Sequence, residues 1–100
     1  MFKITKKQEG DALTVKVEGR LDTNTSPVFQ SELEPLLGGL TKLTLDLEQL
    51  DYVSSAGLRV LLTFQQELEE SGKTMEVCHV NDIIRDVFDV TGFLDILTIV

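Results

Sequence analysis

Two adjacent serines, Ser54 and Ser55, stand where the sequence changes from a strand pattern to a helix pattern. Residues 43–47 alternate apolar and polar side chains, which favours a β-strand. Apolar residues at 57, 60, 61, 64 and 68 then share one face of a helix. The first turn of a helix has unpaired N–H groups and a partial positive charge, so a serine there can cap it or carry an anion. The pair therefore has two possible roles, as a cap or as a modified hydroxyl.

Other chemistry finds little support in the sequence. We find no glycine-rich phosphate loop, and no base stands beside the serines to activate a nucleophile. Cys78 and His79 are neighbours in a strand pattern, where they should face opposite ways, so we expect no compact metal site from them. Cys78 is expected to pack in the core. The sequence thus predicts no catalytic residue, no metal and no cofactor.

The composition indicates the class of partner. The 100 residues have a formal net charge of −8, and 42% are apolar, enough for one core in a single domain spanning 1–100. Such acidity disfavours nucleic acid and favours a protein with a basic patch. The single cysteine excludes an internal disulfide, and no apolar run is long enough to span a bilayer. We expect a cytoplasmic protein that binds neither nucleic acid nor membrane.

Five strand patterns set the frame of the expected fold. They cover residues 1–6, 13–18, 43–47, 74–80 and 96–100, and the first two should form a hairpin with one solvated face. Residues 48–53 are expected to form a turn. The order ββαβαβαβ predicts an α/β domain, a mixed β-sheet of four to five strands with helices packed against it. The later strands should be parallel and joined by right-handed crossovers.

Three helix patterns lie between these strands. The first follows the cap candidates Thr23–Ser26 and has Pro27 in its first turn, while Pro35 predicts a kink or an end just before it. The second carries the apolar face that follows the two serines. The third is short and should be capped by Asn81 or Asp82.

The central stretch Leu50–Arg59, taken with this element order, resembles the STAS domain (sulfate transporter and anti-sigma factor antagonist). The resemblance covers nearly the whole chain and is strongest to the small stand-alone bacterial anti-anti-sigma factors. Gly19-Arg20-Leu21-Asp22 is similar to the Gly-x-Leu-Asp signature of the family, and residues 84–93 resemble its penultimate helix. Gly-x-Leu-Asp alone is a weak signal, whereas the serine turn before the glycine is fairly specific here.

The chain departs from the family pattern at two places. Many members carry the phosphorylated hydroxyl directly before the glycine of the turn, where this chain has Ala56. The Ser-Ser-Ala-Gly form also occurs in the family, and it implies phosphorylation of Ser55, with Ser54 as the reserve site. We expect Ser55 at the cap itself and Ser54 one residue back, engaged in a backbone hydrogen bond. Many members also continue into a last helix, which is not expected in a sequence ending at Val100.

The resemblance implies a partner-switching protein. Unphosphorylated, it would bind an anti-sigma factor that is a serine-protein kinase and so release the sigma factor; phosphorylation would end the binding and a serine phosphatase would restore it. The implied partner-binding residues are Asp22, Ser54, Ser55, Gly57 and Arg59. Asp22 fits an ordinary turn or capping carboxylate equally well. Two alternatives stay open, a STAS module of a sensory or transport complex and a structural domain with an inert turn.

Overall fold

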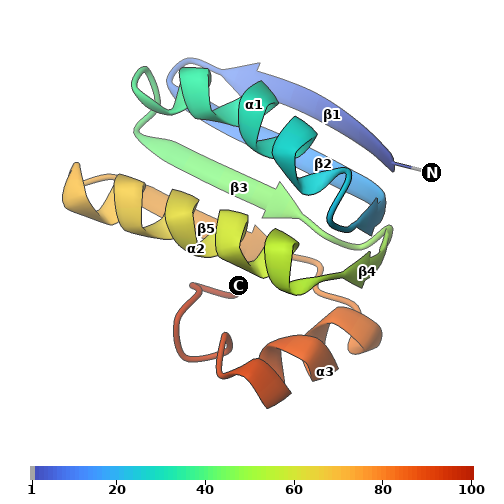
Figure 1. The fold of residues 1–100 in the computed structure, drawn as a ribbon. Helices are drawn as coiled ribbons and strands as arrows, with labels where there is room; N and C mark the ends of the chain where they lie inside the picture. Colours follow the sequence, from blue (N-terminus) through green and yellow to red (C-terminus); the bar gives the residue numbers. More distant parts are fainter. Residues whose placement is uncertain (1) are drawn as a thin grey trace.

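The fold is a five-stranded sheet with two helices on one face and a third helix at its end (Figure 1). The computed structural model describes residues 2–100; Met1, which the sequence pattern assigns to the first strand, lies outside the described residues. The elements, in chain order, are β1 Phe2–Glu9, β2 Ala12–Leu21, α1 Ser26–Leu37, β3 Lys42–Asp46, β4 Leu50–Val53, α2 Ser55–Glu70, β5 Thr74–Cys78 and α3 Asp82–Thr91.

The sheet is mixed, as the element order predicts. Strands β1 and β2 form the antiparallel hairpin, with Phe2 opposite Gly19 and Glu9 opposite Ala12. On the other edge of β2 lies β3, which is parallel to it, and β5 is parallel to β3 in turn. Strand β4 also pairs with β2 in parallel, beyond the end of β3, so that it continues the path of β3 along the same edge (Figure 1).

Two predictions about strands were wrong. Residues 50–53 form β4 and not a turn: a register shift between Gly19 and Arg20 gives β4 a buried-exposed-exposed-buried order, which hides the strand period. The final strand expected over 96–100 is reduced to one parallel bridge between Val77 and Ile99. Turn hydrogen bonds continue as far as the N–H of Leu97, so only the last residues reach β5.

Helix α1 continues through Pro35 to Leu37, so of the two outcomes expected near Glu34, a kink or an end, the end is not found. Pro35 removes one backbone hydrogen bond of the helix, but the burial of apolar side chains before and after it outweighs that loss. Leu33 and Leu37 are both buried, and the ring of Phe29 lies 5.5 Å from the ring of Phe64 in α2. Core packing therefore extends the helix beyond the point where local propensity would end it.

The core lies between the sheet and its helices. Alternate residues of the parallel strands, such as Leu43 and Leu45 of β3, are buried there, while Thr44 and Asp46 point to the opposite, open face. That open face is polar, and Lys42 and Glu76 form an ion pair across it with a 3.0 Å separation. Among the described residues, no helix has the length and apolar character needed to cross a membrane.

Candidate functional site

Helix α2 begins at the serine pair, and the two serines have different roles there. The residue at the cap is Ser54: its Oγ accepts a hydrogen bond from the Gly57 N–H at 3.3 Å. Its own N–H donates to the Leu21 carbonyl of β2 at 2.9 Å, which ties the cap to the sheet. Ser55 is the first helical residue, and its side chain is exposed. The expectation that Ser55 forms the cap was wrong by one residue, whereas the backbone hydrogen bond expected of Ser54 is present.

Gly57 sets how closely α2 approaches the sheet. A Cβ atom at this position would lie 2.9 Å from Leu21 Cγ, from the Leu21 carbonyl oxygen and from Val53 Cγ2. A backbone oxygen cannot move aside as the end of a side chain can, so only glycine fits. Gly57 was expected among the partner-binding residues. Because it is buried, its role is to position the serines and not to form a surface contact.

The loop between β2 and α1 is organised by Asp22. Its Oδ1 accepts hydrogen bonds from the N–H of Thr25 at 3.0 Å and of Asn24 at 2.9 Å. The pKa of Asp22 is held below its ordinary value, chiefly by the hydrogen bond from the Thr25 N–H. The bond from Asn24 and the nearby Arg20 guanidinium act in the same direction. Asp22 is therefore a turn carboxylate, and any contact it makes with a partner adds to that structural role.

Arg20 has a second contact beside this loop. Its guanidinium carbon lies 4.2 Å from the centroid of the Tyr52 ring on β4, a cation–π contact. The sequence contains no signal for this pair, since the register shift between the strands decides which residues are neighbours.

A groove of about 350 Å³ runs between the first turns of α1 and α2. Arg59 is exposed and lines it, one helical turn after Ser55. The other lining residues come from both helices and the loop before α1: Thr23, Ser26, Pro27, Gln30, Ala56, Val60 and Thr63. The structure thus brings the loop of Asp22, the serine turn and Arg59 to one end of the helical layer. The α1 side of the groove was not predicted, because no sequence pattern indicates which helix flanks α2.

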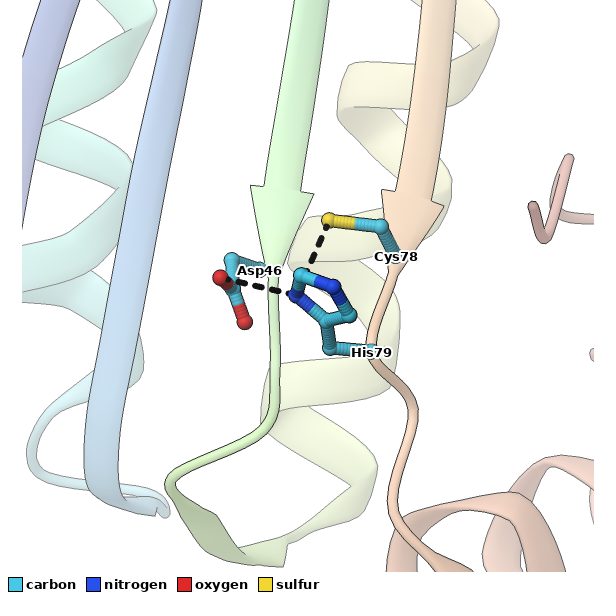
Figure 2. A group of neighbouring side chains, drawn as sticks. All are labelled: Asp46, Cys78 and His79. Carbon is cyan, nitrogen blue, oxygen red and sulfur yellow. Dashed lines mark hydrogen bonds and ion pairs between the residues drawn. The ribbon is translucent and has the colours of Figure 1, made fainter.

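A second polar cluster lies on the open face of the sheet, where Asp46, Cys78 and His79 meet (Figure 2). The expectation that Cys78 and His79 face opposite ways was wrong: β5 ends at Cys78, and His79 adopts a left-handed backbone with φ 53°. Its Nδ1 lies 3.0 Å from Asp46 Oδ2 and 3.8 Å from Cys78 Sγ. Cys78 is half-buried and not a core residue.

The three side chains alter one another's acidity. The hydrogen bond to Asp46, together with its charge, raises the pKa of His79. Burial, followed by the charge of Asp46, raises the pKa of the Cys78 thiol. Asp46 is therefore the anionic centre of this cluster, and it lies on the face of the sheet opposite α2 (Figure 2).

Comparison with known proteins identifies the family. The family model described as "Mlab, STAS domain" matches residues 4–98. The chain belongs to the STAS domain family. BtrV of Bordetella bronchiseptica, named as a candidate anti-sigma factor antagonist, is 31% identical over 98% of this STAS domain and 85% of its own length. The anti-sigma-B factor antagonist of Bacillus subtilis is 27% identical, over 93% of this domain and 85% of that protein.

Solved structures share the fold. An anti-sigma factor antagonist from Mycobacterium paratuberculosis superposes with a TM-score of 0.88 at 18% identity, covering 99% of this domain and 85% of that chain. The Bacillus cell fate determinant SpoIIAA in its phosphorylated form gives a TM-score of 0.77 at 18% identity, covering 100% and 91%. At these identities the likeness establishes the STAS architecture, which the sequence predicts.

Proposed function

We propose that this STAS domain is an anti-sigma factor antagonist that binds its partner until Ser55 is phosphorylated. The proposal rests on the different roles of the two serines at the start of α2. Ser54 uses its hydroxyl oxygen to cap the helix, and Ser55 presents an exposed hydroxyl in the first turn. The names of the curated relatives, which are anti-sigma factor antagonists, supply the class of partner.

A phosphate on Ser55 is compatible with the folded domain. Phosphoserine carries about −1.5 to −2 charges and three acceptor oxygens. The first turn of a helix favours an anion, and the first turn of α2 contains no acidic residue that would repel one. Arg59 is four residues further along the same helical face and within reach of the added charge. The modification would therefore change the surface and leave the fold intact.

The same phosphate opposes binding by a partner that covers this turn. A partner packed against the groove and the exposed Ser55 would have to remove the phosphate from water, which is costly unless its charge is matched. The Asp22 loop beside α1 adds a carboxylate at the same end of the helical layer. The partner in this proposal is an anti-sigma factor that is itself a serine-protein kinase and supplies the ATP, and a serine phosphatase reverses the switch.

The test is binding of the full chain to the anti-sigma kinase encoded in the same genome, measured by calorimetry with a non-hydrolysable ATP analogue. Ser55→Ala should bind as the unmodified protein does and, in a separate incubation of kinase with ATP, accept no phosphate. Ser55→Asp should keep its melting temperature and bind at least tenfold more weakly. Ser71→Asp is the matched control, because it adds the same charge at the other end of α2, about 24 Å along the axis.

Two results would contradict the proposal. Equal affinity of Ser55→Asp and the unmodified protein would show that charge at Ser55 is not the switch. No binding of the unmodified protein to any anti-sigma factor of its genome would favour a STAS module of a sensory or transport complex instead.

A further inference from the structure

The cluster of Asp46, Cys78 and His79 is separate from the serine turn. It joins the carboxyl ends of β3 and β5 on the open face of the sheet, whereas Ser55 belongs to the helical layer on the other face (Figure 2). Its three donor atoms are one carboxylate oxygen, one thiol sulfur and one imidazole nitrogen, all within 4.8 Å of one another. The proposed partner switch makes no use of them.

The geometry excludes a nucleophilic Cys–His–Asp triad. Such a triad needs the carboxylate and the thiol on different ring nitrogens, so that one nitrogen orients the ring while the other takes the proton. Here both Asp46 Oδ2, at 3.0 Å, and Cys78 Sγ, at 3.8 Å, approach the same Nδ1 of His79. The three donor atoms instead lie within 4.8 Å of one another, a spacing from which they could surround one cation.

The backbone of His79 supports this arrangement. It is the only non-glycine residue with a positive φ in the part of the chain that the structure describes. A left-handed conformation is unfavourable for histidine, and here it turns the ring back over the end of β5 toward Asp46 and Cys78. An extended residue would point the ring to the other face of the sheet.

We propose that Asp46, Cys78 and His79 form a binding site for a divalent transition-metal ion of the Zn²⁺ type. Thiolate, imidazole and carboxylate are the donors that Zn²⁺ takes in proteins, and tetrahedral coordination places them about 3.3 to 3.6 Å apart. The contacts of 3.0 and 3.8 Å to Nδ1 lie on either side of that range, so small side-chain rotations suffice. On binding, the ion replaces the thiol proton of Cys78 and the Nδ1 hydrogen that His79 donates to Asp46, and the neutral imidazole then carries its single hydrogen on Nε2.

Three protein ligands leave a fourth position open. The side chain of His79 is 63% exposed, so that position faces solvent and takes water or a donor from another molecule. The site also has a structural consequence for the turn after β3. The Leu47 N–H donates to the Cys78 carbonyl, and the Asn81 amide donates to the carbonyls of Leu47 and Leu50. A metal ion between β3 and β5 would stabilise this junction and the start of α3.

The test is metal binding to the full chain after treatment with a chelator and a reductant. Co²⁺ serves as the spectroscopic probe, since a thiolate ligand gives an intense charge-transfer absorption, and Zn²⁺ should displace it at one ion per chain. Cys78→Ser should abolish the thiolate absorption, and His79→Asn, which tolerates the left-handed backbone, should weaken Zn²⁺ at least tenfold. Glu76→Gln is the matched control, because it removes a carboxylate from the same face and the same strand.

A melting curve with and without Zn²⁺ separates loss of the site from loss of the fold. The unmodified protein and Glu76→Gln should gain melting temperature with Zn²⁺, whereas Cys78→Ser and His79→Asn should gain none while their metal-free curves stay cooperative. Absence of a thiolate absorption with Co²⁺ in the unmodified protein would overturn the proposal. Equal Zn²⁺ affinity in Cys78→Ser and the unmodified protein would overturn it as well.

Discussion

The two helices on the sheet begin with similar residues and leave different surfaces. At the start of α1, the Thr25 hydroxyl donates to the Arg20 carbonyl at 2.7 Å, and the Ser26 hydroxyl donates to the Asp22 carbonyl at 2.6 Å. At the start of α2, the Ser54 Oγ accepts a hydrogen bond from the Gly57 N–H, but Ser55 is exposed. Serine and threonine at a helix start are therefore poor markers of a modification site until their hydrogen bonds are counted.

The charge at the two helix starts differs as well. The carboxylate of Asp22 lies in the loop before α1 and accepts hydrogen bonds from the N–H groups of Asn24 and Thr25, so an anion is already present near that end of the helix. The first turn of α2 has none. A phosphate is therefore better accommodated at α2 than at α1, where it would face Asp22.

The largest expected effect tests whether the start of α2 is fixed by contact with β2. Gly57→Ala should lower the free energy of unfolding by about 1–3 kcal/mol, because the new methyl group meets the Leu21 carbonyl oxygen at 2.9 Å. Helix propensity alone predicts the opposite sign. Urea unfolding decides between them, and Gly38→Ala at the end of α1 is the control, since nothing lies within 4 Å of its Cβ. Equal urea midpoints for Gly57→Ala and Gly38→Ala would show that close contact with β2 does not fix the start of α2.

The next effect separates the two serines. Ser54→Ala removes the cap and should cost about 1 kcal/mol of unfolding free energy. Ser55→Ala should stay within about 0.5 kcal/mol of the unmodified protein, because an exposed side chain is lost. Urea unfolding of the two variants side by side measures the difference. A larger loss for Ser55→Ala would reverse the roles assigned to the two hydroxyls.

The smallest effect concerns the carboxylate at the start of α1. The folded pKa of Asp22 is lowered, so its ionised form stabilises the fold above the unfolded value near 3.8, and this contribution is lost as the pH falls through the folded pKa. Asp22→Asn keeps the acceptor oxygen and loses the charge. Melting temperatures should thus differ between variant and parent above the unfolded pKa of 3.8 and converge as the pH falls through the lowered folded pKa. If the melting temperatures of variant and parent differed by the same amount at every pH, the charge of Asp22 would not stabilise the fold.

The sequence predicted the hairpin, the strand and the helix on either side of residues 48–53, and the mixed sheet, because each rests on a local hydrophobic period. It could not predict β4, since the register shift against β2 places an extra residue, Asp51, in β4 and removes the alternation between Leu50 and Val53. It also could not place Cys78 and His79 on one face. Alternation holds only while the strand continues, and the left-handed backbone at His79 follows from tertiary contacts that no local pattern records.

The candidate site was predictable in part. The two serines, the glycine and Arg59 were found from residue types and from the family resemblance, and the structure places them together at the start of α2. Which of the two serines forms the cap was not predictable, because it depends on which side chain accepts the hydrogen bond of the Gly57 N–H. The contribution of α1 to the groove required the packing of both helices on the same face of the sheet.

The proposed switch requires that a kinase reaches the Ser55 hydroxyl. Its most direct test is the position of the phosphate after incubation of the full chain with its anti-sigma kinase and ATP, mapped by fragmentation mass spectrometry. One phosphate is expected, on Ser55, and none on Ser54 or on Thr23, the exposed hydroxyl that lines the groove from the α1 side. Phosphate on Ser54, whose oxygen caps α2, would contradict it, and so would an unmodified chain in the presence of an active kinase.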